Sequence, residues 1–224
     1  RLLQKILPYK KLLGGVAIEV QNKVFAMLSE LEKGRLPEQK INEYAEYFCK
    51  YLNGSLPPDF AGWTTARLRK KLFALLNRPL RVCGMVRNEG EPGGGPFWVL
   101  QKDGSHSVQI VESAHVRPGD KRQQAVWSAS QFFNPVDLVC CTRDFRGNKF
   151  DLEKYVDRDA YLISAKMEKG AMLLAQELPG LWNGSMAYWN SVFVELPLIV
   201  FNPVKTVFDL LRPQHDAGGT KKIK

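Results

Sequence analysis

The spacing of apolar residues changes at Arg78, and this change constrains the fold more than any other feature of the chain. Before it, apolar side chains recur three and four positions apart, which is the spacing of one helix face. After it, short apolar runs separated by Gly and Pro are typical of buried strands. The predicted helices of the first part cover residues 8–31, 37–52 and 64–76.

The second part mixes strands and helices without strict alternation. Strands are predicted over residues 79–86, 97–101, 107–112, 136–142, 161–164 and 191–196. A polar loop is predicted over 117–124, and helices over 184–190 and 203–212. We therefore expect an α/β fold with a mixed sheet and an N-terminal helical segment. The expected domains are a basic helical segment (1–77), a mixed α/β subdomain (78–213) and a flexible tail (214–224).

The chain is basic, and the excess charge lies in its first part. The formal net charge is +9, and residues 1–87 contain 16 Lys and Arg against 7 Asp and Glu. Residues 88–224 are balanced, with 16 of each sign. Such a region indicates either a nucleic-acid or polyphosphate partner or a solvated helix surface.

Cysteines, histidines and hydropathy exclude several classes of protein. The four cysteines form no C-x-x-C pair and the three histidines add no ligand spacing, so we expect buried free thiols and no zinc site. No apolar run approaches twenty residues and no signal-peptide pattern is present. These features predict a cytoplasmic protein without a membrane partner.

The segment Phe201–Leu211 reads as a helix start that carries a lysine. Asn202 suits the N-cap and Pro203 the first helical position. Lys205 then falls in the first turn, where a cation opposes the helix dipole unless an anion is bound there. The residue is therefore either part of a phosphate site or a solvated lysine on an amphipathic helix.

A second candidate is the glycine-rich stretch after the strand predicted at residues 79–86. Gly93, Gly94 and Gly95 allow a ligand to approach the backbone closely. No G-K-[ST] follows, so the stretch is not a P-loop. The neighbouring Glu89 and Glu91 would repel bare phosphate and suit a sugar hydroxyl or a metal-bound group. The alternative is a tight surface hairpin.

Three further polar residues follow or precede predicted strands. Glu112 ends a strand-like run, where its carboxylate could hold a sugar hydroxyl or face solvent. Asn134 precedes Pro135, which is itself a turn signal, and Asp137 is more readily interpreted as structural than as catalytic. No Ser/His/Asp set or Cys/His pair has supporting context.

The order of five blocks resembles a bacterial family known as domain of unknown function 4301. These blocks are RVCGMVRNEGEPGGGPF (81–97), QIVESAHV (109–116), FNPVDL (133–138), ELPGLWNGSMAYWNSVFVELP (177–197) and FNPVKTVFDLL (201–211). That family in turn resembles the UDP-glucose pyrophosphorylase group of sugar nucleotidyltransferases. The second resemblance is carried by three of the blocks, which are similar to that group's L-V-E-I-A-Q-V, F-N-T-N-N-L and F-[LN]-P-V-K-T-x-x-D-L-L motifs.

The resemblance implies roles for individual residues. Lys205 would be the catalytic lysine that contacts phosphate, and Glu112 and Asn134 match motif positions near the sugar. This sequence has Pro135, Val136 and Asp137 where the group has T-N-N, which puts the sugar contacts of those asparagines in doubt. The loop at 93–95 has no clear counterpart in the group.

The resemblance also implies an incomplete GT-A/Rossmann-like fold. The chain contains neither a G-x-G-T-R-type nucleotide loop nor an N-x-D-N metal segment, and it begins at Arg1. We therefore expect the C-terminal half of a nucleotidyltransferase-like protein acting on a sugar 1-phosphate and a nucleoside triphosphate, inactive as this fragment. Mg²⁺ is expected for the complete protein, with its ligands outside this chain. The alternatives are a non-catalytic nucleotide- or sugar-phosphate-binding relative and a nucleic-acid-binding module that uses the basic helices.

Overall fold

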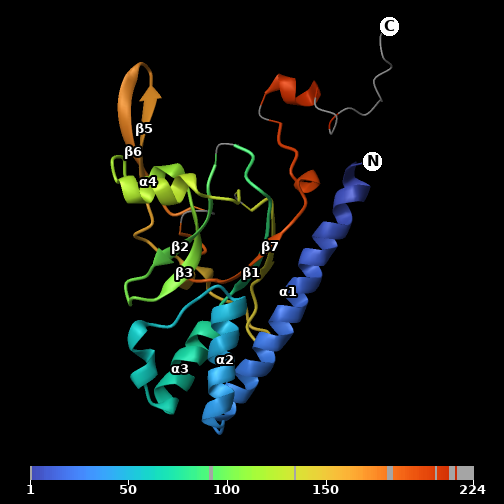
Figure 1. Cartoon of the computed structure of the whole chain (residues 1–224), viewed down its shortest axis with the longest axis vertical. Coiled ribbons are helices and arrows are strands. Elements are labelled where there is room, and N and C mark those ends of the chain that lie inside the picture. Colours follow the sequence, from blue (N-terminus) through green and yellow to red (C-terminus); the bar gives the residue numbers. More distant parts are fainter. Residues whose placement is uncertain are drawn as a thin grey trace.

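A computed structural model describes residues 2–90, 93–133, 135–180, 184–204, 206–211 and 215. Figure 1 shows a helical layer below and beside a small sheet, with two hairpins on the side away from the longest helix. The α-helices are α1 (Leu2–Lys33), α2 (Glu38–Tyr51), α3 (Thr65–Leu76) and α4 (Lys121–Ser128). The strands are β1 (Leu80–Met85), β2 (Gly95–Leu100), β3 (His106–Val111), β4 (Asp137–Cys141), β5 (Leu162–Glu168), β6 (Ala171–Glu177) and β7 (Asn190–Glu195).

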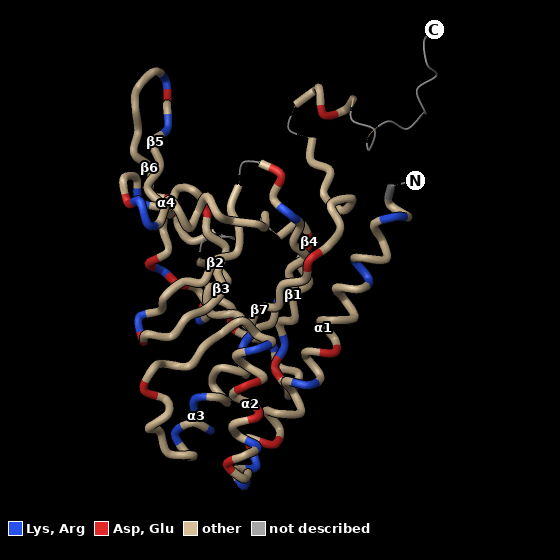
Figure 2. The backbone as a smooth tube through the Cα atoms, in the orientation of Figure 1, with Lys and Arg blue, Asp and Glu red and all other residues tan. Residues whose placement is uncertain are grey.

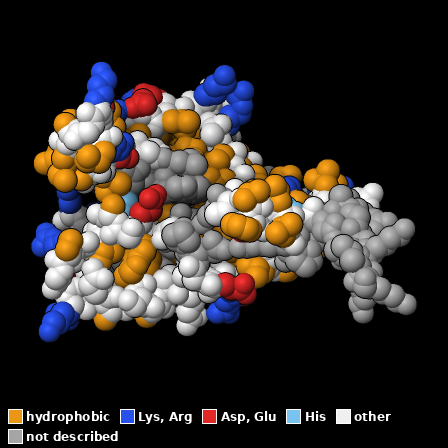
Figure 3. All heavy atoms as spheres, turned by 90° about the horizontal axis from the view of Figure 1, so that it is seen from above, with side chains coloured by type: hydrophobic (Ala, Val, Ile, Leu, Met, Phe, Trp, Pro, Cys, Tyr) orange, Lys and Arg blue, Asp and Glu red, His pale blue; other side chains and the backbone are white. Residues whose placement is uncertain are grey.

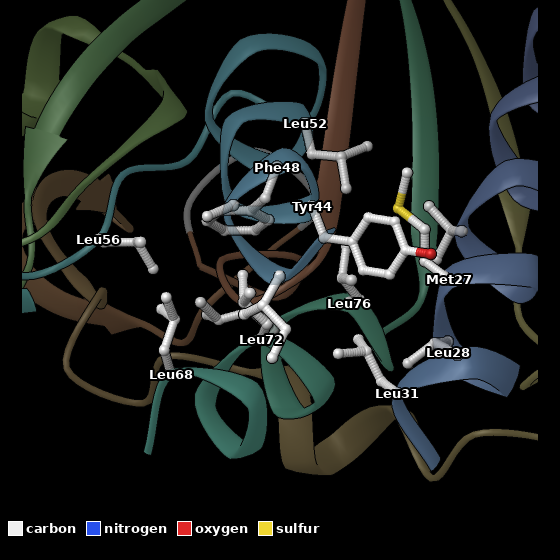
Figure 4. Packing of buried hydrophobic residues seen from close by; sticks show 14 of the residues in the cluster. Met27, Leu28, Leu31, Tyr44, Phe48, Leu52, Leu56, Leu68, Leu72 and Leu76 are labelled. Atoms are coloured by element: carbon white, nitrogen blue, oxygen red, sulfur yellow. The ribbon is translucent and has the colours of Figure 1, made fainter. Parts of the chain in front are cut away.

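The first three helices share one apolar core. Leu28, Leu31, Ile41, Leu72 and Leu76 are almost completely buried where α1, α2 and α3 meet (Figure 4). Their spacing puts each set on one helix face, which explains why three separate amphipathic segments pack together. The side chain of Thr64 caps α3 by accepting the Arg67 backbone N–H at 3.3 Å.

The central sheet is mixed and has the strand order β4-β1-β7. β1 pairs with β4 in antiparallel orientation and with β7 in parallel orientation. In this register Gly84 lies opposite Asp137 on one side and Val194 on the other. The predictions of an α/β fold, a mixed sheet and an N-terminal helical segment are confirmed.

The two faces of β1 are covered by different elements. On one face, Leu13 and Ala17 of α1 pack against Val82 and Leu196. On the other face, Cys83 and Met85 pack in one cluster with Ile110 of β3. The antiparallel β2–β3 hairpin thus lies across the sheet from α1, between α4 and α3 (Figure 1).

The second hairpin, β5–β6, projects away from the sheet (Figure 1). Its turn residues Lys169 and Gly170 both have positive φ, 50° and 83°, as a two-residue type I′ turn requires. Hydrophobic side chains gather on its surface in Figure 3. Met167, Met172 and Leu174 of this hairpin are largely exposed.

The basic helices carry acidic partners. Figure 2 shows Glu interspersed with Lys and Arg over α1 and α2, whereas α3 carries no acidic residue. The ion pairs that involve these helices or the segment before α3 are Lys10–Asp137, Lys40–Glu43, Arg67–Asp59, Lys71–Asp103 and Arg146–Glu32. Two of these pairs, Lys10–Asp137 and Lys71–Asp103, bring acidic residues from the second part of the chain to lysines of the first, so a small part of the basic excess is neutralised within the molecule.

Some local predictions are wrong. Residues 117–124 were predicted as a loop, but α4 begins at Lys121, because the Asp120 carboxylate caps it by accepting the backbone N–H groups of Arg122 and Gln123. Residues 184–188 form turns rather than a helix, and β7 begins at Asn190. All four cysteines are free, but only Cys83 is buried as predicted, whereas Cys49 and Cys141 are half-buried and Cys140 is exposed. Among the described residues, no helix is long and apolar enough to cross a membrane.

The contact of α1 with the sheet gives a test of the fold. Leu13 is 0% exposed, whereas its neighbour Leu12 on the same helix is 51% exposed. Leu13→Ala is expected to lower the free energy of unfolding by about 2–5 kcal/mol, because it leaves a cavity between helix and sheet. Leu12→Ala, the matched control, should change it by less than about 0.5 kcal/mol. Urea denaturation measures both, and equal losses would contradict this packing.

Candidate functional site

The carboxyl end of β1, which pairs with the end of β7 in the block 177–197, is also where the other four sequence blocks converge. Gly95 and Val111 are paired at one end of the β2–β3 hairpin, so Glu112 directly follows that pair. The backbone N–H of Phe133 donates to the Val86 carbonyl at 3.0 Å, which places a third block at the same end. The Phe201 ring lies 4.9 Å from the Phe133 ring, which brings in the fourth. This group of segments is called the β1-end cluster below.

Gly95 is required by close packing rather than by backbone conformation. A Cβ at this position would lie 2.5 Å from the Phe132 carbonyl oxygen and 2.8 Å from the Ser130 hydroxyl oxygen. Gly93, Gly94 and Gly95 are not among the described glycines with positive φ. Gly94 and Gly95 are buried and Gly93 is exposed. The stretch therefore packs the start of the β2–β3 hairpin closely against residues 130–133. Of its three glycines, Gly93 is the one exposed to solvent.

Glu112 is half-buried and has a structural partner. Its carboxylate accepts the backbone N–H of His115, and its own backbone N–H donates to His115 Nδ1 at 2.9 Å. This reciprocal cap fixes both side chains on the short 3₁₀ turn Ser113–His115. Because Nδ1 accepts a hydrogen bond, the neutral imidazole carries its proton on Nε2. The cap leaves acceptor positions on the Glu112 carboxylate for a further partner.

The remaining predicted residues are placed differently. Asp137, the first residue of β4, forms an ion pair with Lys10 and so ties α1 to the sheet. Asn134 and Lys205 lie outside the described residues. The structure thus brings Gly95 and Glu112 together and directs Asp137 toward α1.

The predicted helix start at Asn202 is wrong. The Asn202 amide donates to the Ile199 carbonyl at 2.6 Å instead of capping a helix that follows. Pro203 and Val204 are not helical, and the first regular turn is a 3₁₀ helix at Val207–Leu211. The buried Asp209 carboxylate accepts the Thr206 backbone N–H at 2.7 Å. A carboxylate of the chain itself therefore occupies the anion position at the start of this turn.

Sequence reasoning missed an ion pair at the same end of the sheet. Arg87 Nε donates to Glu195 Oε1 at 2.9 Å, and its guanidinium lies 4.9 Å from the Phe132 ring centre. Met85 and Glu195 are paired across β1 and β7, so this bridge closes the carboxyl ends of both strands. The signal that could have identified it is a pair of opposite charges at the ends of two strands, since Glu195 is the last residue of β7 and Arg87 lies two residues after β1.

A cavity of about 810 Å³ runs along the β2–β3 hairpin. Its walls come from α4 and the Ser113–His115 turn, from the hairpin, from α3 and from residues 184–191. This volume lies within the range of small-molecule sites. The β1-end cluster borders it, since Val111, His115 and Val116 line the cavity on either side of Glu112.

Aromatic side chains and cations line this cavity together. Phe97 and Trp127 stack with their ring centres 5.5 Å apart and an angle of 16° between the rings. The cationic lining residues are Lys71, Arg78, Lys102 and Arg122. Such a lining suits a ligand that combines a ring or apolar body with negative charge.

The described residues do not fit a metal centre. No three His, Cys, Asp or Glu side chains in this part of the chain lie close enough together to hold an ion. Two lining or neighbouring side chains are instead buried with an unpartnered polar atom within the described structure: Trp189 Nε1 and Asn77 Oδ1. The chemistry offered by the described walls is therefore hydrogen bonding, stacking and charge neutralisation.

Comparison with known proteins shows the family of the chain. The family model for the domain of unknown function DUF4301 matches residues 1–216, so the chain belongs to this family. No curated protein matches. A solved structure of a UDP-glucose pyrophosphorylase variant from Leishmania major, in complex with UDP-glucose, is 18% identical with a TM-score of 0.37. The match covers 66% of this chain but 33% of that enzyme, and at this identity and TM-score it says nothing about activity.

The packing of Gly95 gives a second test. Gly95→Ala is expected to lower the free energy of unfolding by about 1–3 kcal/mol, because the new methyl group forces the hairpin away from Phe132. Gly62→Ala is the control, since no atom lies within 4 Å of its added Cβ. It should change stability by less than about 0.5 kcal/mol. Thermal or urea unfolding compares them, and an unperturbed Gly95→Ala variant would contradict the close approach.

The cap between Glu112 and His115 gives a third test. Long-range ¹H–¹⁵N NMR at a pH where histidines are neutral should show His115 as the Nε2–H tautomer. His106 serves as the internal reference, because its ring makes no hydrogen bond within the described residues. It should show averaged tautomers. A dominant Nδ1–H form of His115 would rule out the cap.

Proposed function

We propose that this chain is the sugar-phosphate-binding part of a nucleotidyltransferase-like protein that acts on a sugar 1-phosphate and a nucleoside triphosphate. The observation that supports it most is the convergence of Gly95, Glu112, Phe133 and Phe201 beside the cavity. These residues belong to four separate blocks, three of which resemble sugar nucleotidyltransferase motifs. Ligand sites of α/β proteins also lie beyond the carboxyl ends of strands.

The proposed reaction is an in-line displacement. A phosphate oxygen of the sugar 1-phosphate attacks the α-phosphorus of the triphosphate, the bond to the bridging oxygen breaks, and pyrophosphate leaves with the electron pair. Such reactions depend on positioning and charge neutralisation. In this proposal Lys205 neutralises phosphate, and Glu112, Asn134 and the 93–95 stretch hold the sugar side. Asp137 acts indirectly, through its ion pair with Lys10.

Mg²⁺ would neutralise phosphate charge in the complete protein. We propose that its ligands lie outside this chain, and the residues described here offer no cluster for it. No step above depends on it. The chain alone is then expected to bind ligand with little or no turnover.

A non-catalytic binding protein is the second candidate. It is favoured by the structural use of carboxylates near the site, since Glu112 caps a turn, Asp209 accepts the Thr206 N–H, and Asp137 pairs with Lys10. Such a protein would bind the same ligands without releasing pyrophosphate, even when joined to a nucleotide-binding half.

Calorimetric titration of the chain with glucose 1-phosphate and with UTP tests the proposal. Lys205→Ala and Glu112→Gln are each expected to weaken binding of at least one ligand about tenfold, which corresponds to about 1.4 kcal/mol. Glu112→Gln keeps an acceptor for the cap, so it isolates the charge. Lys154→Ala is the control, because Lys154 pairs with Asp151 and neither residue lines the cavity. Unchanged affinity in both test variants would reject this site.

A pyrophosphate-release assay separates the two candidates. Catalysis predicts release when the chain is part of a protein that also supplies a nucleotide loop and metal ligands. Ligand binding without release by that protein would favour the non-catalytic candidate.

A further inference from the structure

The end of the cavity nearest α3 contains a guanidinium group that forms no ion pair within the described residues, although the charge of Asp103 attracts it. Arg78 lies between α3 and β1, lines the cavity and is half-buried. Its Nε donates to the Ala74 carbonyl at 3.3 Å, and its two Nη groups make no hydrogen bond or ion pair within the described residues. Burial lowers the pKa of this guanidinium, which reflects the cost of holding its charge away from water.

The acidic residues around Arg78 have other partners. Asp103 forms an ion pair with Lys71 at 3.1 Å and also accepts the Ser105 hydroxyl. Asp159 pairs with Lys102. Asp157 also lines the cavity, where its Oδ1 accepts the Asp159 backbone N–H at 3.0 Å and no ion pair joins it to Arg78. A half-buried cation that forms no ion pair with its own chain is stabilised when a ligand supplies the anion.

An independent observation at the same end is the unpartnered indole of Trp189. Trp189 is 8% exposed and lines the cavity, and its Nε1–H has no acceptor within the described structure. The next residue, Asn190, donates its backbone N–H to the Pro79 carbonyl at 2.8 Å. This bond brings the backbones of Trp189 and Arg78 next to each other, and both side chains line the cavity.

Arg81 is a buried guanidinium with a different role. It is 2% exposed, and its Nε donates to the Ser191 hydroxyl at 2.8 Å. It is not among the residues that line the cavity, so it joins β1 to β7 and leaves Arg78 as the accessible group.

We propose that the α3 end of the cavity binds a small organic anion. Its carboxylate or phosphate group pairs with the two Nη groups of Arg78 and accepts the Trp189 indole N–H. A planar guanidinium suits either anion, because both accept two parallel hydrogen bonds. The aromatic or apolar body of the ligand packs on lining side chains such as Leu75, Ala187 and Tyr188.

This anion site lies apart from the β1-end cluster. Arg78 precedes β1, whereas Gly95 and Glu112 lie beyond its carboxyl end. Six residues at about 3.3 Å each separate the two ends by roughly 20 Å. The proposed anion is therefore not the sugar phosphate of the previous subsection, and the two proposals can fail separately.

The test uses phenyl phosphate and benzoate as probes and inorganic phosphate as the probe without a body. In ¹H–¹⁵N spectra, the Trp189 indole N–H signal, assigned with Trp189→Phe, is expected to move downfield as either organic probe binds. Arg78→Gln should weaken the binding of both probes at least tenfold in calorimetric titration. Lys102→Gln is the matched control, since Lys102 lines the same cavity but pairs with Asp159. The affinity of the Lys102→Gln variant for both organic probes should stay within twofold of that of the unmodified chain.

Several results would overturn the anion site. They are an unmoved Trp189 signal at millimolar probe, equal affinity of Arg78→Gln and the unmodified chain, or an equal loss in Lys102→Gln. If Arg78→Gln does not fold, Arg78→Lys replaces it, because lysine keeps the charge but loses the paired hydrogen bonds. A stronger response to phenyl phosphate than to benzoate identifies a phosphate ligand, and the reverse a carboxylate. Lys205→Ala and Glu112→Gln should leave both probes bound, which distinguishes this site from the sugar-phosphate site.

Discussion

The burial of β1 on both faces and along both edges is the constraint on which the rest of the structure depends. All six of its residues are buried, Arg81 among them. Buried backbone groups must be hydrogen-bonded, so β1 requires β4 on one edge and β7 on the other. Its side chains require α1 on one face and Ile110 of the β2–β3 hairpin on the opposite face. Because its sides are covered, polar groups that can meet a ligand gather beyond its two ends.

The elements that bury apolar surface around β1 were predictable from sequence. The helical spacing of Ile41, Tyr44 and Phe48 and the apolar run after Pro79 gave α2 and β1, and the structure confirms both. In these elements burial and periodicity express the same requirement, since a side chain that must face the core recurs with the period of its own backbone. The strand pairing was not predictable, because β7 lies about 110 residues after its parallel partner.

Elements with little buried surface could not be identified in this way. Ala171, Met172, Leu173 and Leu174 are good helix formers, yet they form β6 because the Lys169–Gly170 turn returns the chain on itself. Their faces are largely exposed, so no alternation of polar and apolar residues marks the strand. At the segment after Phe201 the propensities of single residues were misleading, because the Asn202 side chain bonds backward to Ile199.

The two candidate sites differ in how far sequence could find them. Gly95 and Glu112 belong to blocks with recognisable motifs, and folding brings those blocks together at one end of β1. Arg78 belongs to no recognisable motif, because an arginine before a strand is common. It is a candidate anion site because the carboxylates of Asp103 and Asp159 form ion pairs with lysines and not with Arg78. Whether Arg78 has an ion-pair partner depends on side chains that are spread over residues 71–159 of the sequence. It can therefore be seen only in the folded structure. Since the same hairpin forms a wall of both ends of the cavity, a ligand that shifts this hairpin at Arg78 would also shift Glu112. Rigid pairing of β2 with β3 would transmit such a shift, whereas a hairpin that bends between its ends would leave the two ends independent.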